Sequence, residues 1–453
     1  MVGAARQGAA LSRYLVEKGA AVALNDRRSE EALAEVRKEL SDLNLTWVTG
    51  SHPIEILEDA DLVCISGGVP LDLPIIQEAI KRNIPISNDS QIFLDNAPCR
   101  VIGITGSAGK TTTTSLVGEI AKHHFSLRKP DNTVWVGGNI GTPLIKDLDE
   151  MHEDDLAVME LSSFQLEIMT TSPQIAAILN LTPNHLDRHG SMSEYISAKS
   201  NILTHQSPNG IAVLNRDDPN VRELFSEVNG RRITFGYNPP LNKQDTTYCK
   251  RDKLFLQADG QTAKIINTEF VNLRGKHNLY NVLAAIAISA AASLSIQAIY
   301  EGIIAFKGVS HRLEFVRAWG GADWFNDSIA TAPERAIAAL ESFEDPIILL
   351  AGGRDKNLSW TRMGEAIRQK VDHLILFGEV AELIQDAVGK VGPNLRPYSI
   401  DLCKNLEESV KIAAERVSPG DVVLLSPGGT SFDEFIDFEE RGKRFKQWVQ
   451  ELS

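Results

Sequence analysis

The chain has few cysteines, and their spacing excludes two kinds of structural site. Its 453 residues include only four, and no two of them form a C-x-x-C pair. Zinc sites and disulfide frameworks need close or numerous cysteines, so we expect neither. We expect ordinary, mostly buried thiols at Cys64, Cys99, Cys249 and Cys403.

Long apolar runs and an excess of basic charge are also missing. No run approaches the ~20 apolar residues that span a membrane, and the opening MVGAARQG lacks the regions of a signal peptide. Acidic residues number 60 against 46 basic ones, with no basic stripe to follow a nucleic-acid backbone. The sequence therefore predicts a cytoplasmic protein that binds neither membrane nor nucleic acid, and we expect a monomer that acts on small molecules.

The sequence does contain a repeated strand-then-helix rhythm. Short β-rich runs alternate with helical patterns, for example at residues 20–26, 100–106 and 346–353. This alternation predicts an α/β fold with parallel sheets covered by helices. A chain of this length favours roughly three domains, and turn-forming segments place their boundaries. We expect domains at residues 1–96, 97–307 and 308–453.

The segment GITGSAGKTTTT, at residues 103–114, predicts a phosphate-binding loop. A strand, a tight turn and a helix follow one another here, so backbone N–H groups and the helix dipole face an anion. Lys110 adds a positive charge, and the Thr111 hydroxyl is suited to Mg²⁺. We expect the phosphates of ATP to meet Gly106, Ser107, Ala108, Gly109, Lys110, Thr111 and Thr112.

A second glycine-rich segment, GAARQG at residues 3–8, opens the chain. It precedes a helix, and Asp26 follows about twenty residues later, as in a dinucleotide-binding fold. Alone, this pattern suggests NAD, although Ala5 replaces the second glycine. An NAD-dependent dehydrogenase is therefore one alternative, but it leaves the phosphate loop without a role.

The phosphate loop has the form T-G-x-x-G-K-[ST], which is found in Mur ligases and folylpolyglutamate synthases. Nine further segments, in order along the chain, resemble the Mur ligase family. They are GGNIGTP (137–143), MELSSFQLE (159–167), NLTPNHLDRHG (180–190), YISAKSNIL (195–203), VLNRDDP (213–219), LRGKHNLYN (273–281), HRLEF (311–315), NDSIATAPERA (326–336) and LLSPGGTSFDEF (424–435).

The resemblance implies an ATP-dependent amide ligase of peptidoglycan precursor synthesis with three domains. A Rossmann-like N-terminal domain would bind a UDP-sugar substrate, a P-loop ATPase-like domain would bind ATP, and a C-terminal Rossmann-like domain would bind an amino acid. ELSSFQLE and SPGGTSFDEF favour the members that join D-glutamate to UDP-N-acetylmuramoyl-L-alanine. Another Mur ligase or a folylpolyglutamate synthase remains an alternative. A regulatory P-loop ATPase would leave the third domain unexplained.

The catalytic roles that the resemblance implies centre on Mg²⁺. Beside Lys110, Glu160 would hold Mg²⁺ with Thr111, and His185 would ligate a second ion or orient the acyl group. Lys199 would carry a carbamate made from its amine and CO₂, which burial favours because it lowers the lysine pKa. The cofactors expected are thus ATP and Mg²⁺.

The substrate-binding residues are implied in the same way. ATP would also contact Asn278, Arg312 and Asp327. The UDP-substrate would contact Arg6, Gln7, Asp26, Arg28 and Asn139. D-glutamate would contact Thr331, Lys356, Ser431 and Phe432.

Three features depart from the family pattern. Many relatives have lysine where this chain has Ile329, so one positive charge is absent from the expected amino-acid site. Asn184 stands where others have aspartate, beside His185. The chain also begins where the first β-strand is expected to be ending, which predicts an incomplete sheet edge.

Overall fold

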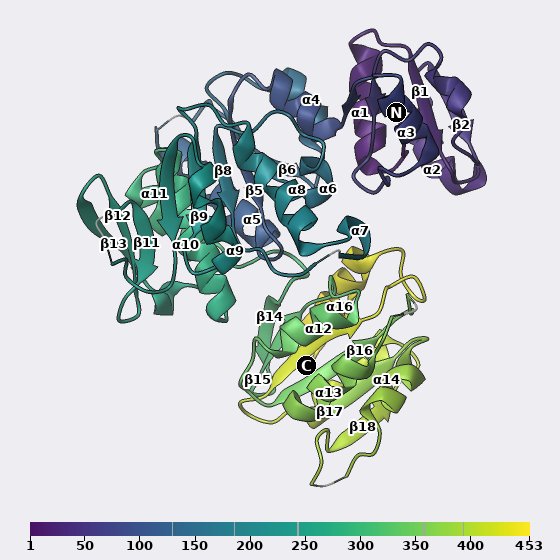
Figure 1. The fold of residues 1–453 in the computed structure, drawn as a ribbon. Helices are drawn as coiled ribbons and strands as arrows, with labels where there is room; N and C mark the ends of the chain where they lie inside the picture. Colours follow the sequence, from purple (N-terminus) through teal and green to yellow (C-terminus); the bar gives the residue numbers. More distant parts are fainter. Residues whose placement is uncertain (129, 185, 242–243, 357, 393) are drawn as a thin grey trace. The chain divides into compact units, whose positions relative to one another are not determined.

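The computed structural model describes residues 1–128, 130–184, 186–241, 244–356, 358–392 and 394–453 (Figure 1). It divides into two compact units. Unit 1 comprises Met1–Val271 and His277–Phe306, and unit 2 comprises Asn272–Lys276 and Lys307–Ser453. The domain boundaries predicted from the sequence stay a prediction.

The N-terminal part of unit 1 contains two small parallel sheets. β1 (Val22–Asp26) pairs with β2 (Leu45–Thr49), and β3 (Val63–Cys64) pairs with β4 (Ile86–Ser87). Val2 forms parallel bridges with both Asn25 and Ile65, so it occupies a strand position between the sheets. The helices here are α1 (Arg6–Glu17), α2 (Ala34–Glu39) and α3 (Pro74–Lys81).

Helix α4 (Asp89–Asn96) anchors the N-terminal part to the central sheet domain. Its N-cap, Asn88, accepts a hydrogen bond from the Gln91 backbone and donates one to the Gln165 carbonyl at 2.9 Å. The Gln165 amide also donates to the Ser90 hydroxyl at 2.7 Å, and these groups are buried. Buried polar groups must find partners, so these bonds fix where the helix packs.

The central sheet has nine strands in the order β13-β12-β11-β10-β9-β8-β5-β7-β6. Pairs from β6 to β11 are parallel, whereas β12 and β13 form an antiparallel extension. Its strands are β5 (Arg100–Thr105), β6 (Val134–Gly138), β7 (Leu156–Glu160), β8 (Ile175–Ile178), β9 (Ile211–Asn215), β10 (Arg231–Phe235), β11 (Thr246–Cys249), β12 (Lys253–Ala258) and β13 (Gln261–Asn267). Its helices are α5 (Lys110–Arg128), α6 (Ser163–Leu166), α7 (Leu186–His189), α8 (Met192–Thr204), α9 (Pro219–Glu223), α10 (Lys276–Ala291) and α11 (Ile296–Ala305).

Unit 2 is a six-stranded sheet in the order β14-β15-β19-β16-β17-β18, parallel except at the β14 edge. Its elements are β14 (Glu314–Trp319), β15 (Ala322–Asn326), α12 (Pro333–Leu340), β16 (Ile347–Gly352), α13 (Thr361–Lys370), β17 (Val371–Phe377), α14 (Ala381–Val388), β18 (Ser399–Leu402), α15 (Leu406–Arg416), β19 (Val422–Gly428) and α16 (Phe438–Glu451).

Both faces of this second sheet are covered. Leu349 of β16 packs in a cluster with α12, α13 and α14, while its neighbour Leu350 packs in a cluster with α15 and α16. Successive strand side chains point to opposite faces, so a continuous apolar run such as residues 347–351 serves both layers. The α/β fold class predicted from the sequence is confirmed. None of the described helices is long and apolar enough to cross a membrane.

Trp324 provides a test of the packing in unit 2. Its side chain is fully buried, its indole N–H donates to the Trp319 carbonyl at 3.3 Å, and its ring packs against Phe445. Trp324→Ala should lower the free energy of unfolding of unit 2 by about 3–5 kcal/mol because it leaves a cavity. Urea unfolding measures this change. Ile436→Ala, at a side chain 80% exposed, is the control and should shift the midpoint little.

Candidate active site

The phosphate loop connects β5 to α5 and has a conformation that requires glycine. Gly109 has φ +82°, and a Cβ added there would lie 2.2 Å from the Asn281 Oδ1 of α10. Asn180 holds the loop from the other side, since its carbonyl accepts from Ser107 N–H at 2.9 Å and its side chain from Ala108 N–H at 2.8 Å. The loop is therefore held in this shape by contacts with Asn180 and Asn281.

Lys110 begins α5 and turns back over the loop. Its ammonium donates to the Gly106 carbonyl at 2.9 Å and to the Ser107 carbonyl at 3.3 Å. These contacts keep the positive charge beside the N–H groups of the helix start, where an anion is favoured. Thr112, one residue beyond Thr111, is buried in the first turn of α5.

Glu160 ends β7, the strand next to β5, and its carboxylate meets the phosphate loop. Thr111 donates its hydroxyl to Glu160 Oε2 at 2.8 Å, and the Asn139 amide donates to Glu160 Oε1 at 2.9 Å. Glu160 is 2% exposed. The adjacent strand ends thus bring together three of the predicted residues, although they lie far apart in sequence.

Lys199 of α8 lies on the other side of β5. Its ammonium is 1% exposed and donates to the Thr105 hydroxyl at 3.0 Å, with the Tyr195 ring centroid 5.1 Å away. Burial lowers its pKa well below the usual value, the charge of Lys110 lowers it further, and Glu160 opposes the shift. In the described part of the chain, no carboxylate lies within salt-bridge distance of it. This lysine therefore favours the neutral amine.

The N-terminal candidates adjoin this cluster. Arg6 donates to the Asn139 carbonyl at 3.3 Å. Gln7 lies beside Gly67 together with Gln165, since a Cβ at Gly67 would be 3.5 Å from Gln7 Oε1 and 3.7 Å from Gln165 Cγ. Arg6 therefore contacts Asn139, which in turn contacts Glu160, whereas Gln7 lies beside Gly67 and Gln165.

Asp26 is tied to its own domain. Its carboxylate accepts from the Ala4 N–H at 2.8 Å and from three N–H groups of Arg28. Burial opposes ionisation, but the bonds to Arg28 and Ala4 outweigh it and hold the pKa of Asp26 well below its usual range. Asp26 thus shapes the glycine-rich segment at residues 3–8 and orients Arg28.

Other candidates are placed with fewer contacts. Asn278 of α10 is buried and accepts a hydrogen bond from the Asn281 amide at 3.0 Å, which places it one helical turn from the phosphate loop. His185 lies outside the described residues. No described group of three or more His, Cys, Asp or Glu side chains could hold a metal ion.

The candidates in unit 2 follow β15, β16 and β19, which are neighbours in the sheet. Asp327 is 4% exposed and accepts from Leu313 N–H and the Ser426 hydroxyl, and burial raises its pKa to about 7. Ser431 is buried, whereas Phe432 is 60% exposed. The remaining candidates of this unit are the half-buried Arg312 and Thr331 and the exposed Lys356.

Two residues that sequence reasoning did not single out also shape the site. The Tyr195 hydroxyl is 2.9 Å from the Ser107 hydroxyl, so one ring contacts both Lys199 and the phosphate loop. The Gln165 side chain accepts from both the N–H and the hydroxyl of Ser162 at 2.9 Å. Both residues lie within family-like segments, Tyr195 in YISAKSNIL and Gln165 in MELSSFQLE. Their hydrogen-bond partners become visible only in the folded chain.

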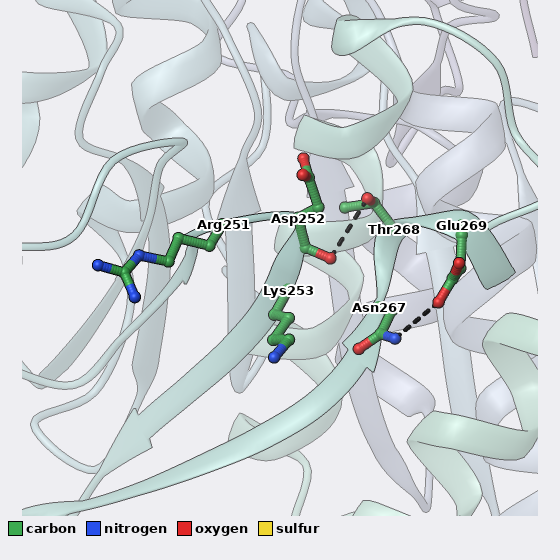
Figure 2. A pocket seen from close by; sticks show the side chains of 6 residues that line it. All are labelled: Arg251, Asp252, Lys253, Asn267, Thr268 and Glu269. Carbon is green, nitrogen blue, oxygen red and sulfur yellow. Dashed lines mark hydrogen bonds between the residues drawn. The ribbon is translucent and has the colours of Figure 1, made fainter.

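A polar hollow of about 420 Å³ lies at the β12–β13 hairpin, away from these motifs (Figure 2). Thr268 donates to the Asp252 carbonyl at 3.3 Å, and Asn267 donates to Glu269 at 2.7 Å across it. None of the predicted site residues lines it. The hollow therefore has no part in the candidate site.

Comparisons with known proteins identify the family of the chain. Three family models match: the Mur ligase MurD-like, N-terminal domain over residues 1–88, the Mur ligase middle domain over 104–289, and the Mur ligase, glutamate ligase domain over 311–429. The chain is 41% identical to the UDP-N-acetylmuramoylalanine--D-glutamate ligase of Symbiobacterium thermophilum, with 100% of this chain and 98% of that protein covered. It is 40% identical, with the same coverage, to the ligase of the same name from Clostridioides difficile.

Solved structures share the fold. Thermotoga maritima UDP-N-acetylmuramate-alanine ligase MurC superposes with a TM-score of 0.58 at 22% identity, covering 99% of this chain and 98% of that one. Acinetobacter baumannii MurF gives 0.59 at 18% identity, covering 95% and 92%. Together with the phosphate loop, the family models and the named relatives define an ATP-dependent ligase. The chain belongs to the Mur ligase family and has its N-terminal, middle and C-terminal domains in order.

The close approach of α10 to the phosphate loop predicts that Gly109→Ala impairs nucleotide binding. The substitution forces the Asn281 side chain away from the loop, and we expect ATP affinity to fall by about tenfold or more, as measured by calorimetry. Gly260→Ala is the matched control: Gly260 also has positive φ, +76°, but nothing lies within 4 Å of the added Cβ. It should pay a similar backbone strain of about 1–2 kcal/mol and bind ATP normally. Equal affinities for the two variants would contradict the steric argument.

Asp26 predicts a pH-dependent difference in stability. Its folded pKa lies below the unfolded value of 3.8, so its stabilisation is present above about pH 4 and is lost as pH falls toward the folded pKa. Asp26→Asn should cost about 2 kcal/mol at pH 7, and the difference from wild type should shrink below pH 4. Thermal unfolding across pH measures it; a difference that is constant with pH would contradict the ionic role.

Proposed function

We propose that this ATP-dependent ligase adds D-glutamate to UDP-N-acetylmuramoyl-L-alanine and forms ADP and phosphate. The named relatives support the substrates, since they match the chain over its full length. The observation that carries the chemistry is the meeting of Thr111, Glu160 and Lys199 around the phosphate loop. A nucleotide phosphate bound there would have a carboxylate, a hydroxyl and a lysine beside it.

The residues present fit Mg²⁺. This ion keeps several waters and takes one or two carboxylates together with phosphate oxygens, so a site need not be built from protein ligands alone. Glu160 and the Thr111 hydroxyl would hold it, and His185 and a carbamate on Lys199 would hold a second ion. Bound there, Mg²⁺ neutralises phosphate charge and polarises the phosphoryl group.

The buried Lys199 supports the carbamate. A neutral amine attacks CO₂ to form a C–N bond and releases one proton, which leaves a carboxylate-like group where an ammonium stood. Burial favours the neutral amine. No described carboxylate forms an ion pair with Lys199, so the negative charge of the carbamate would be available to neutralise cations nearby. The Tyr195 ring and the Thr105 hydroxyl would orient the side chain.

The proposed reaction has two bond-forming steps. The substrate carboxylate takes the γ-phosphoryl group from ATP, which gives an acyl phosphate and ADP. The D-glutamate amine then attacks the carbonyl through a tetrahedral intermediate, and phosphate and a proton leave as the amide forms. Lys110 and the loop N–H groups would stabilise the transferring phosphoryl group, and positioning would supply most of the remaining rate.

Each domain would then bind one substrate. Residues 1–96 would bind the UDP-substrate through Arg6, Gln7, Asp26 and Arg28, with help from Asn139. Residues 97–307 would bind ATP through the phosphate loop and Asn278. Residues 308–453 would contribute Arg312 and Asp327 to ATP, and Thr331, Lys356, Ser431 and Phe432 to D-glutamate. A cytoplasmic location and a monomeric state, without nucleic-acid or membrane partners, stay predictions.

Phosphate release from ATP tests the proposal across a panel of D- and L-amino acids. We expect release only when Mg²⁺, UDP-N-acetylmuramoyl-L-alanine and D-glutamate are all present. Lys199→Ala should lower the rate by about a hundredfold or more, since it removes charge stabilisation at the reacting phosphoryl group. Lys264→Ala, at an exposed lysine of β13, is the control and should keep full activity.

The other outcomes are informative. Turnover with a different amino acid would keep the ligase chemistry and contradict the D-glutamate assignment. Full activity of Lys199→Ala would contradict the role of this lysine. A change in nicotinamide absorbance on substrate addition would instead support a dehydrogenase.

A further inference from the structure

Backbone hydrogen bonds join three loops at the carboxyl ends of strands in the unit 2 sheet. We call these loops, residues 327–331, 352–356 and 428–431, the rim. They follow β15, β16 and β19, which are adjacent strands. Gly428 N–H donates to the Ala330 carbonyl at 2.8 Å, and Arg354 and Thr430 exchange two backbone bonds of 2.9 Å. These bonds fix the positions of the three loops relative to one another.

The Arg441 side chain of α16 is hydrogen-bonded to two of the rim loops. Its fully buried guanidinium donates to the Ser328 hydroxyl at 3.0 Å, to the Ser328 carbonyl at 2.8 Å and to the Gly429 carbonyl at 3.1 Å. All three nitrogens of the guanidinium therefore donate hydrogen bonds to the protein itself. Arg441 therefore keeps the rim in shape without offering its charge to a ligand.

Three further cations lie in or beside the rim: Arg354, Lys356 and, on α12, Arg335. They differ in whether a carboxylate neutralises their charge. Arg354 makes two bonds to Glu379, at 2.9 and 2.8 Å. Arg335 and Lys356 have no ion pair among the described residues. The Arg335 guanidinium donates to the Ile329 carbonyl at 3.2 Å, so it is fixed to the rim while its remaining N–H groups are open.

The electrostatics of these open cations indicate a missing anion. Although both side chains reach solvent, partial desolvation and the charge of Arg312 lower the pKa of Arg335, with Asp327 opposing. Partial desolvation and the charge of Arg335 lower the pKa of Lys356 in the same way. Asp327 opposes the shift of Arg335, but it forms no ion pair with Arg335 or Lys356 among the described residues, and burial raises its own pKa to about 7. Like charges held together cost free energy that a bound anion recovers.

We infer that Arg335 is a substrate-binding residue that works with Lys356 to receive the two carboxylates of a dicarboxylic amino acid. This inference rests on the proposed function and adds to it a residue at the amino-acid site. A guanidinium offers paired N–H groups in the geometry that a carboxylate accepts. Arg335 also supplies, at the carbonyl of Ile329, the charge that the sequence lacks at position 329.

The test is steady-state phosphate release by the full-length enzyme, with each of the three substrates varied in turn. Arg335→Ala should raise the KM for D-glutamate by about tenfold or more, because charge-assisted hydrogen bonds are lost. The KM values for ATP and the UDP-substrate should stay within twofold. Arg335→Lys should recover part of the loss. Arg396→Ala is the matched control, since Arg396 lies outside the rim and Asp372 neutralises its charge at 2.7 Å, and all three KM values should stay unchanged.

Several results would overturn the inference. A rise confined to the KM for ATP would assign Arg335 to the nucleotide, and an equal rise in all three would mark a structural role. An Arg335→Lys variant no better than Arg335→Ala would remove the charge argument. If the wild type uses another dicarboxylic amino acid, the D-glutamate assignment fails while the same comparison decides the role of Arg335. If it accepts only monocarboxylic amino acids, or none, both proposals fall.

Discussion

The candidate site depends on the hydrogen bonds that the Glu160 carboxylate accepts. Glu160 ends β7, which lies between β5 and the edge strand β6, and accepts hydrogen bonds from Thr111 of the phosphate loop and from Asn139. Arg6 bonds to the backbone of Asn139, so the glycine-rich segment of the N-terminal part is connected through one amide to the same carboxylate. Loss of this acceptor would leave the Thr111 hydroxyl and the Asn139 amide without their common partner.

The sequence predicts those parts of the site that are local. The strand, turn and helix around Lys110 are contiguous, so their pattern and their chemistry are visible together. Glu160 is recognisable because a polar residue ends a buried apolar run. The α/β class follows from strand runs that are apolar on both faces, as β16 is.

Other contacts could not be predicted because they join residues distant in the chain. Arg441 reaches Ser328 across 113 positions, and Tyr195 reaches Ser107 across 88. Arg335 lies only six positions from Ile329, yet its proposed role depends on Lys356, which lies in the loop after β16. The composition of a helix does not show which neighbouring loop its side chains will meet, since packing decides this.

The contact between Gly109 and Asn281 couples the residue types that these two positions can hold. An Asn281 side chain of this size and position leaves no space for a Cβ at residue 109, although the two positions lie on different elements. A lineage that shortens the side chain at 281 relaxes the steric demand at 109 but not the demand of its positive φ. Glycine at 109 is thus required for two independent reasons, one steric and one conformational.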